Sequence, residues 1–398
     1  MNATETPSLL PGIDRRQFFK LGGGLAVAII LQDVIAFAAD STPALTNPVP
    51  SSQVGAWIHI GEDNLVTVFT GKVEVGQNIR TSLTQQVAEE LNVPVSSIKM
   101  VMGDTDLVPF DNGTYGSLTT PQMGTQLRYT AATARQTLLD LAARHWGADV
   151  NSLKAAEGMI SDQKSGKKIS FGALTKGQQI LIPITKQIPL IDPENWKTAG
   201  KTIAKINDRS FVNGSHKYVS DMKLPDMLYA KILRPTAYQA KLLTVDLDAA
   251  KALPGVTVIQ EGAFIAVLAD RLHKAIKALS TIKATWESPD QPSKGQLFDY
   301  LVENARKADP ETTELRQGFT ASELQHTDTY TIDYIAHVPL EPRAAVAEFE
   351  NGKLTVWTGT QRPFGVQQDL AAKFDIPKEN VRVLVPDTGS GYGGKHSG

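Results

Sequence analysis

Apolar positions near the start of the folded chain recur with two different periods. Alternation at residues 56–60 and 65–69, on either side of a polar turn at 61–64, predicts a β-hairpin. A spacing of four residues then predicts a helix, because it places one apolar side chain on the same face at every turn. The residues with this spacing are Ile79, Leu83, Val87 and Leu91. Pro94 ends this helix.

The pattern continues with a strand at 98–102 and a loop at 103–124 that is rich in Gly, Thr, Ser, Pro and Asp. A second helix follows, with an apolar face that begins at Leu127. Residues 50 to about 150 therefore predict an α+β unit. Residues 150–215 have few long apolar runs, and we expect them to form an irregular connection.

From Val219 the pattern predicts a small domain in which strands alternate with helices. The expected strands are 228–233, 243–247, 256–259, 264–268 and 284–286, and the expected helices are 249–253 and 275–279. Two prolines in residues 288–295 indicate a linker. The last part is predicted to contain strands at 330–335, 344–350, 354–357 and 381–385 and a helix at 364–374.

The first forty residues have the pattern of an export signal. Arg15 and Arg16, followed by Phe18, Phe19 and Lys20, precede an uncharged run at 21–31 and small residues at 36–38. The run is shorter than the roughly 20 residues that cross a bilayer. The arrangement resembles a twin-arginine signal, which implies a periplasmic protein that receives its cofactor before export. The alternative is a basic amphipathic start without an export role. Residues 1–40 are assigned to this signal and 41–55 to a linker.

Composition removes several functional classes. The chain has 398 residues, and its 40 basic and 42 acidic side chains give a net charge of -2, so it lacks the basic surface typical of nucleic-acid binding. It has no cysteine, which excludes disulfides, thiolate metal sites, Cys-ligated iron–sulfur clusters and a Cys nucleophile. A chain of this composition that handles electrons must pass them to another subunit.

A glycine-rich loop at 389–395 follows the predicted strand at 381–385. Gly389, Gly391 and Gly394 match the dinucleotide pattern Gly-x-Gly-x-x-Gly, but no helix or acidic residue follows in the chain. His396 stands where a phosphate loop needs Ser or Thr. What these glycines allow is a close approach of backbone N–H groups to an anion or an oxo group. The alternative is a glycine-rich end of a hairpin.

Two helix starts are candidate anion sites, because free N–H groups gather there. Gly76, Gln77 and Thr81 surround the start of the first helix. Before the second helix, the chain has the hydroxyl-bearing residues Ser117, Thr119 and Thr120, and then Gly124. Ordinary helix capping would produce much the same composition at both places.

Other chemistries find little support in the sequence. The seven histidines are scattered, and none lies at metal-ligand spacing from another, so we expect no metal bound directly by side chains. A serine hydrolase would need a Gly-x-Ser-x-Gly elbow, which the chain lacks. The segment 337–343 pairs ionisable residues with two prolines, and we assign no catalytic role to Glu341 within it.

Several short motifs, taken in order, resemble the molybdopterin-binding subunit of the xanthine oxidase family. They are Gly71–Gln77 with Thr81, Ala88–Leu91, Gly103–Thr105, Gly113–Ser117, His337–Pro342, Thr360–Gln361 and Gly389–Lys395. The order, with an export signal first, is similar to the isoquinoline 1-oxidoreductase β-subunit and related aldehyde or N-heterocycle dehydrogenases. The resemblance implies an α+β fold in which molybdopterin-binding segments flank a small α/β hammerhead domain. Residues 56–215 would form the first such segment, 216–288 the hammerhead domain and 296–398 the start of a further molybdopterin-binding domain.

The resemblance also implies site residues. Gly76, Gln77, Thr81, Ser117, Thr119 and Thr120 would hold the pterin and its dinucleotide phosphates. Gln361 would approach an oxygen on molybdenum, and the backbone of Gly391 and Tyr392 would line the metal. Lys395 would close that loop, and Gly393 within it also belongs to the cofactor-binding residues. The family usually has Phe at the position of Tyr392. His396 replaces a glutamate that contacts substrate in purine enzymes, which argues against a purine.

The implied function is that of a molybdenum hydroxylase subunit with a molybdenum–molybdopterin cytosine dinucleotide cofactor. It would oxidise an aldehyde or an N-heterocycle with oxygen from water and pass electrons to a subunit with two [2Fe-2S] clusters, and then to a c-type cytochrome. The catalytic glutamate of the family is expected beyond Gly398, so we expect the chain to be truncated. The alternatives are an inactive remnant that still folds, and a nucleotide-dependent oxidoreductase built on the loop at 389–395.

Overall fold

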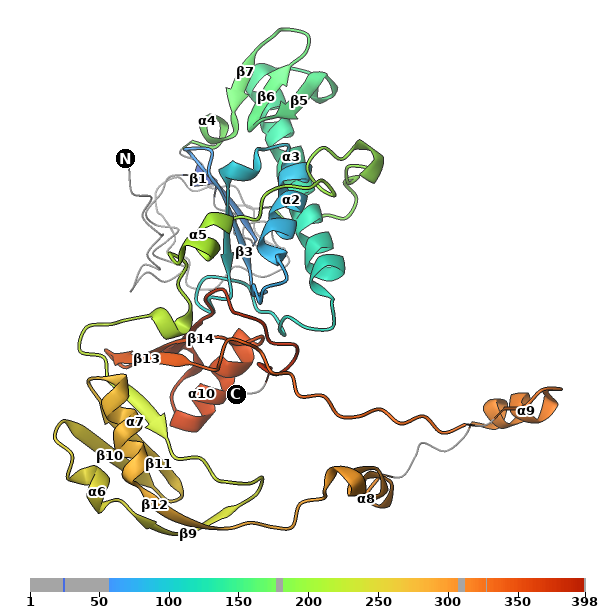
Figure 1. Ribbon diagram of the computed structural model, residues 1–398. Coiled ribbons are helices and arrows are strands. Elements are labelled where there is room, and N and C mark those ends of the chain that lie inside the picture. Colours follow the sequence, from blue (N-terminus) through green and yellow to red (C-terminus); the bar gives the residue numbers. More distant parts are fainter. Residues whose placement is uncertain (1–23, 26–56, 177–181, 307–311, 327, 397–398) are drawn as a thin grey trace. The chain divides into compact units, whose positions relative to one another are not determined.

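The computed structural model describes residues 24–25, 57–176, 182–306, 312–326 and 328–396. The chain folds as two compact units, the first made of Met1–Met222 with His337–Gly398 and the second of Lys223–Ala336. Figure 1 shows the elements of both units in sequence colours. Within the described ranges, none of the helices combines the length and the apolar character that crossing a membrane requires.

The first unit is built on a sheet with the strand order β1-β2-β3-β4. The strands are β1 (Gly24–Leu25), β2 (Ile58–Gly61), β3 (Val66–Thr70) and β4 (Ile98–Met102). The predicted hairpin is confirmed: β2 and β3 are antiparallel with Ile58 opposite Val68. Strands β3 and β4 are parallel, as their connection through a helix requires. The predicted export signal and linker lie within residues 1–56, of which the structure describes only Gly24–Leu25.

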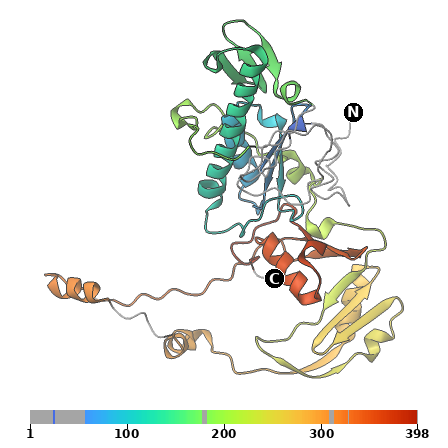
Figure 2. The same cartoon turned by 180° about the vertical axis from the view of Figure 1, so that it is seen from behind.

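Helices α2 (Ile79–Leu91) and α3 (Thr125–Trp146) pack against each other beside this sheet, as Figures 1 and 2 show. The predicted repeat forms the contact, because Leu83, Val87 and Leu91 are fully buried in one core with Val66 and Val68 of β3. Pro94 ends the first helix region as expected and is followed by the 3-10 turn η2 (Val95–Ser97). The predicted loop at 103–124 is corrected at its end, where Thr119–Gly124 form the π-helical turn η3 that runs into α3.

The expectation of an irregular connection at 150–215 is wrong for its first part. The turn η4 (Val150–Ser152) leads into an antiparallel sheet of β5 (Leu153–Ala156), β6 (Met159–Asp162) and β7 (Lys168–Ser170), followed by α4 (Phe171–Thr175). These strands are three or four residues long and bury at most two side chains each, so they produce no long apolar run. The remainder has only the short elements η5 (Pro193–Asn195), α5 (Asp208–Asn213) and η6 (Val219–Asp221) among its described residues.

The C-terminal part of the first unit contains a second sheet, of β13 (Ala345–Glu350), β14 (Lys353–Thr358) and β15 (Val381–Leu384). Helix α10 (Pro363–Phe374) and the turn η8 (Lys378–Asn380) connect β14 to the parallel β15. These elements match the predicted ones within one residue at nearly every end. A buried, bidentate pair between Arg382 and Asp104, with N···O distances of 3.0 and 2.6 Å, ties β15 to the loop after β4.

The second unit contains the sheet β10-β11-β8 and the pair β12-β9. Its strands are β8 (Tyr229–Ile232), β9 (Lys241–Asp246), β10 (Val256–Glu261), β11 (Phe264–Ala269) and β12 (Lys283–Glu287), and its helices α6 (Asp248–Lys251) and α7 (Leu272–Thr281). Every element expected between 228 and 286 is therefore present. The turn η7 (Lys294–Gln296) and the helices α8 (Leu297–Glu303) and α9 (Thr313–Ala321) follow, although no helix was predicted there.

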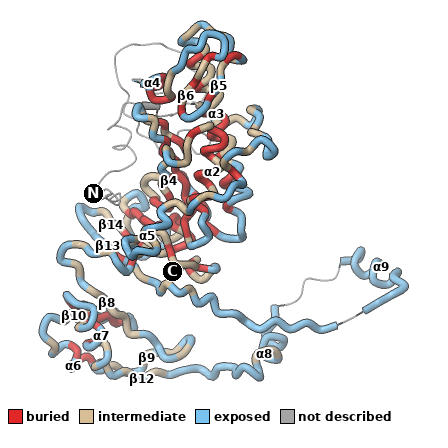
Figure 3. Tube along the Cα trace, turned by 45° about the horizontal axis from the view of Figure 1, so that its top comes forward, coloured by how far each residue is buried: buried red, intermediate tan, exposed pale blue. Residues whose placement is uncertain are grey.

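The predicted strand at 330–335 is wrong. These residues have no strand partner among the described residues, and their apolar side chains are largely exposed. Figure 3 shows the contrast, with buried chain concentrated around α2 and α3 and exposed chain in α8 and α9. An alternating apolar pattern indicates a strand only where a neighbouring strand accepts its hydrogen bonds.

Candidate functional site

Four loops of the first unit are joined by hydrogen bonds into one region. They are 71–78 between β3 and α2, 111–117 before η3, 359–362 between β14 and α10, and 386–396 after β15. The N–H of Val73 donates to the Thr114 hydroxyl at 2.9 Å, and the N–H of Thr388 donates to the Glu74 carbonyl at 2.9 Å. The N–H of Thr114 donates to the Gln361 carbonyl at 2.8 Å. The region thus gathers most of the site residues expected from the sequence.

The start of α2 offers fewer free N–H groups than expected, because Glu74 accepts three of them, while between described residues those of Gln77, Ile79 and Thr81 donate no hydrogen bond. The buried Glu74 carboxylate accepts the N–H groups of Gly76 and Asn78 on one oxygen, at 3.0 and 2.9 Å, and that of Arg80 on the other, at 3.0 Å. A carboxylate in this position compensates the positive end of the helix. Part of the anion site at this helix start is therefore already occupied by the protein's own carboxylate.

Gln77 and Thr81 use their side chains within the protein. The amide of Gln77, which is exposed, accepts the N–H of Val75 at 2.6 Å and donates to the Val73 carbonyl at 3.1 Å. The hydroxyl of Thr81 is buried and accepts the N–H of Ile206 at 3.0 Å. Thr81 therefore faces the segment before α5, while Gly76 and Gln77 lie at the exposed side of their loop.

The start of η3 and α3 is different, because its backbone donors are unused. Among hydrogen bonds between described residues, none has the N–H of Gly116, Ser117, Thr119 or Thr120 as its donor. Gly116 and Ser117 both have positive φ angles, of 63° and 55°. The first turn of α3 contains no acidic residue. This is the kind of helix start that binds phosphate.

Gln361 bridges two of the four loops. Its buried carboxamide donates to the Thr114 carbonyl at 2.8 Å and accepts the N–H of Gly393 at 2.9 Å. A Cβ on Gly391 would lie 2.5 Å from the Gln361 Oε1 atom, so a larger residue at that position would displace the Gln361 carboxamide. One hydrogen on Nε2 remains available beyond the bond to Thr114.

The loop after β15 is held from two sides and leaves its tip free. The Glu341 carboxylate accepts the N–H of Gly389 at 2.7 Å and the Lys395 ammonium at 2.7 Å. From the other side, the N–H of Gln361 donates to the Lys395 carbonyl at 2.9 Å. Between described residues, the N–H groups of Gly391 and Tyr392 donate no hydrogen bond. Gly391 is buried, whereas the Tyr392 side chain is exposed.

His396 lies at the end of this loop, with its ring against the edge of Tyr115 at a centroid distance of 4.5 Å. Burial, with a smaller contribution from the nearby Arg362, lowers the pKa of His396, so that the imidazole is neutral near pH 7. Its buried Nε2 atom has no hydrogen-bond partner among the described residues. A neutral imidazole with an unused nitrogen can donate or accept a single hydrogen bond from a ligand.

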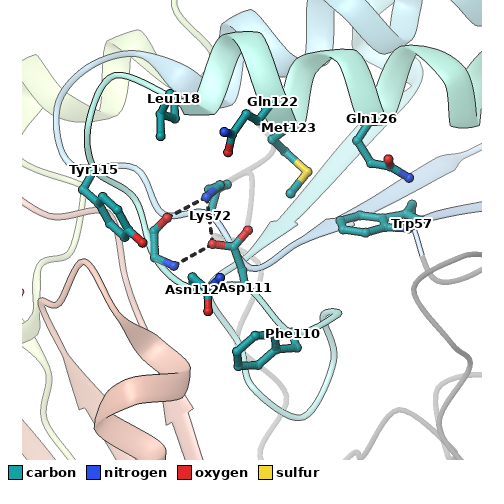
Figure 4. Close-up of a pocket in the computed structure, with 11 residues that line it drawn as sticks. Trp57, Lys72, Phe110, Asp111, Asn112, Tyr115, Leu118, Gln122, Met123 and Gln126 are labelled. Atoms are coloured by element: carbon teal, nitrogen blue, oxygen red, sulfur yellow. Dashed lines mark hydrogen bonds and ion pairs between the residues drawn. The ribbon is translucent and has the colours of Figure 1, made fainter. Parts of the chain in front are cut away.

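A cavity of about 490 Å³ adjoins the loop 111–117, and Figure 4 shows its lining. The apolar side chains come from Trp57, Phe110, Tyr115, Leu118 and Met123 and the polar ones from Lys72, Asp111, Asn112, Gln122 and Gln126, with Gly113 also lining it. Lys72 is paired with Asp111 at 2.8 Å and donates to the Gly113 carbonyl at 2.6 Å. Its charge is therefore neutralised within the protein.

A second polar cluster lies behind the loop after β15. The Arg80 guanidinium donates to Asp387 at 2.6 Å, and the His216 Nε2 atom lies 3.6 Å from the other oxygen of Asp387. His216 stacks on Phe211 with a centroid distance of 4.0 Å. Burial lowers the pKa of His216, while the Asp387 carboxylate opposes this shift. Through these contacts Asp387, which precedes Thr388, is joined to the start of α2 and to residues 211–218.

The site residues predicted from the sequence differ in how far they are exposed. Gly76, Gln77, Ser117, Thr120 and Tyr392 are exposed around the joined loops, whereas Thr81, Thr119, Gln361, Gly391 and Lys395 are buried, and Gly393 lies between these extremes. Sequence reasoning missed Glu74 and Glu341, and no local signal marks either carboxylate as a partner of a distant backbone. In the described ranges, no three His, Asp or Glu side chains gather to hold a metal ion.

Comparison with known protein families finds matches for the two segments that contain these four loops. Residues 14–221 and residues 300–398 match two families that are both described as a molybdopterin cofactor-binding domain. A nicotinate dehydrogenase subunit of Pseudomonas putida is 30% identical over 384 residues, covering 92% of this chain and 32% of that protein. The β-subunit of isoquinoline 1-oxidoreductase from Brevundimonas diminuta is 25% identical over an alignment of 442 residues, covering 96% of this chain and 56% of that protein.

The chain therefore spans about a third of the first relative and just over half of the second. Among solved structures, quinoline 2-oxidoreductase from Pseudomonas putida 86 matches 49% of this chain and 31% of that chain, with a TM-score of 0.41 and 23% identity.

Proposed function

The chain belongs to the molybdopterin-binding subunits of the xanthine oxidase family, and we propose that the joined loops of its first unit hold the cytosine dinucleotide form of that cofactor. The observation that carries the proposal is the set of unused N–H groups at Gly116, Ser117, Thr119 and Thr120. A dinucleotide is bound through its phosphates, and a helix start with free donors and no nearby carboxylate is suited to them.

The residues present fit such a group at two places. The start of η3 and α3 presents backbone donors to an anion, and the loop tip at Gly391 and Tyr392 presents two further N–H groups. An oxygen-rich ligand would satisfy donors that the described chain leaves without acceptors, which otherwise cost free energy where they are buried. The start of α2 is less suited to a phosphate than the start of η3, because a second anion there would be repelled by Glu74.

Each loop then has a distinct task. The backbone at 116–120 would bind phosphate, and the remaining Nε2 hydrogen of Gln361 and the N–H groups of Gly391 and Tyr392 would hold another part of the cofactor. When bound, the cofactor supplies two-electron oxidation of the substrate with oxygen taken from water. His396, with its neutral imidazole, contributes one hydrogen bond to a substrate and no charge.

For the whole enzyme we propose an oxidoreductase that acts on an N-heterocycle or an aldehyde. The two relatives described above are named for nicotinate and isoquinoline, which are both N-heterocycles. Because the chain has no cysteine, it cannot ligate an iron–sulfur cluster through thiolates, and electrons would leave through a separate iron–sulfur subunit and then a c-type cytochrome. Purification of the native complex without any cluster-bearing subunit would contradict this route.

The paired Arg15 and Arg16 lead us to propose export to the periplasm by the twin-arginine route. Replacement of both arginines by lysine should retain the protein in the cytoplasm, as measured by cell fractionation. Equal amounts of the wild-type and the doubly substituted protein in the periplasm would contradict the assignment.

A pair of variants at Ser117 tests the phosphate site. Ser117 is exposed and has a φ angle of 55°, which both Asn and Asp tolerate. Ser117→Asp adds a negative charge at the start of α3, which favours the helix but repels a phosphate. We expect Ser117→Asp to lower cofactor affinity about tenfold or more, and Ser117→Asn to retain it.

The measurement is the molybdenum and pterin content of the purified chain, together with its thermal stability. Equal cofactor content in the two variants would remove the start of α3 from the binding site. Loss of cofactor in both variants, with unchanged stability, would point to the serine hydroxyl as the essential group and would also contradict the backbone account.

A further inference from the structure

Glu341 reaches the loop after β15 from outside it and contacts both of its ends. One oxygen, Oε2, accepts the N–H of Gly389 and the ammonium of Lys395, each at 2.7 Å. The backbone of Gly389 approaches Glu341 so closely that a Cβ there would lie 2.7 Å from the Glu341 Cβ atom. The carboxylate thus closes a loop whose first and last residues are six positions apart in the sequence.

Lys395 depends on this contact. Its side chain is 1% exposed, that of Glu341 is 13% exposed, and among the described residues the Lys395 ammonium has no other acceptor. A buried ammonium without a partner is strongly unfavourable, so the pair keeps the lysine inside the loop. The burial of Tyr218, and next the charge of Glu341, raise the pKa of the Tyr218 phenol.

The opposite side of the loop is held by Gln361. Its side chain accepts the N–H of Gly393, and the Thr360 hydroxyl donates to the Lys395 carbonyl at 3.1 Å. With Gly389, Gly393 and Lys395 all fixed, the N–H groups of Gly391 and Tyr392 between them stay without an acceptor in the described chain. The loop can point these donors at a ligand only while both sides hold.

We propose that Glu341 is a positioning residue, which fixes the loop 389–395 through Gly389 and Lys395 so that the N–H groups of Gly391 and Tyr392 face the cofactor. The proposal rests on the proposed function for the identity of the ligand. Glu341 acts through the loop and not by contact with substrate. The Glu341 oxygen holds the loop by accepting hydrogen bonds from Gly389 and Lys395. The negative charge of Glu341 keeps Lys395 buried.

Three substitutions separate these contributions. Glu341→Gln keeps an oxygen that can accept from Gly389 and Lys395. Lys395→Met removes the buried charge and leaves Glu341 bonded to Gly389. The double variant Glu341→Ala with Lys395→Met removes both members of the pair, which avoids an unpaired buried ammonium and so lets the chain fold.

A matched control comes from the other buried pair in the same unit. Asp104→Ala breaks the contact with Arg382, which has similar burial and also joins distant segments. Among the described residues, no hydrogen bond or ion pair joins the Asp104 side chain to residues 389–395. If the Glu341 variants fail because the fold is less stable, Asp104→Ala should fail in the same way. If they fail because the loop 389–395 is displaced, Asp104→Ala should behave as the wild type.

The experiment measures hydrogen exchange of the peptide that covers 389–396 in the cofactor-free full chain, and molybdenum and pterin content after production in a host that makes the cofactor. We expect the double variant to exchange this peptide at least about tenfold faster than wild type and to lose cofactor by a similar factor. Glu341→Gln, which keeps the acceptor but loses the charge that holds Lys395, should fall between the wild type and the double variant in both measurements, and Asp104→Ala should change neither.

The outcomes distinguish the two proposals. Wild-type exchange in the double variant, or faster exchange with unchanged cofactor content, would overturn the positioning role of Glu341. Equal losses in Asp104→Ala would reduce the effect to stability and would also overturn it. A wild-type chain that binds no cofactor would refute the proposed function, while the exchange data would still decide whether Glu341 fixes the loop.

Discussion

Two helix starts in the same unit differ by a single carboxylate. At α2, Glu74 accepts the N–H groups of Asn78 and Arg80, whereas at α3 the corresponding donors have no acceptor among the described residues. Both starts have similar composition, with glycine and hydroxyl residues near the first turn. Because a carboxylate several residues before a helix can fold back onto it or point away, the sequence alone does not distinguish a capped start from an open one.

Asp162 provides a test at the same scale. Hydrogen bonds from the Ser165 hydroxyl, the Lys164 N–H and the Ser152 hydroxyl lower its pKa from 3.8 to about 2. A lowered carboxyl pKa stabilises the folded state above the unfolded value and loses this contribution as the pH falls from about 4 to about 2.

We therefore predict that Asp162→Asn lowers stability near neutral pH and weakens the dependence of stability on pH between about 4 and 2. The measurement is the unfolding midpoint in denaturant at a series of pH values. Asp369→Asn, at an exposed position on α10, is the control and should leave the pH profile unchanged. A profile for Asp162→Asn that parallels the wild type would contradict the assignment.

At the scale of elements, segments with a regular apolar spacing were predictable from the sequence and segments without one were not. The helices α2, α3 and α10 and the strands of the second unit follow from their apolar spacing, which in α2 and α3 corresponds to a buried face. Strands β5, β6 and β7 were missed because they are too short to show a period. The expected strand at 330–335 has the right alternation and no described partner, which shows that pairing is not encoded locally.

The packing of α2 against α3 includes a buried charge that no pattern indicated. The fully buried Glu90 carboxylate binds Arg128 at 2.8 Å and Arg135 at 3.2 Å, both on α3, and accepts the N–H of Ile191 at 3.2 Å. It therefore joins two helices and the segment before η5. Both guanidinium groups are mostly buried, with 17% and 14% of their side chains exposed.

We predict that Glu90→Ala lowers the free energy of unfolding by about 3 kcal/mol, since removal of one partner leaves two partly buried positive charges. Glu194→Ala, an exposed acidic residue of η5, should change it by less than about 0.5 kcal/mol. Urea denaturation of both variants checks the difference. A Glu90 variant as stable as the Glu194 variant would show that the ion pairs contribute nothing net.

At the scale of the whole molecule, the candidate site joins loops that lie more than 300 residues apart. Gly76, Ser117, Gln361 and Gly391 belong to separate segments of the sequence, and only long-range hydrogen bonds such as that between Gln361 and Gly393 bring them together. Spacing and periodicity contain no information on such contacts. The similarity of motif order to a known family predicted that these segments form one site, which the physical pattern could not do. The roles of Glu74 and Glu341 were found only in the structure.

The central claim is that the first unit holds a molybdopterin dinucleotide through open backbone donors. The most direct measurement is the analysis of the protein purified from its own organism for molybdenum, pterin and the nucleotide released by acid. The account predicts molybdenum, pterin and cytidine monophosphate in amounts equimolar with the chain. A protein that contains no pterin, or a pterin without any nucleotide, would contradict it.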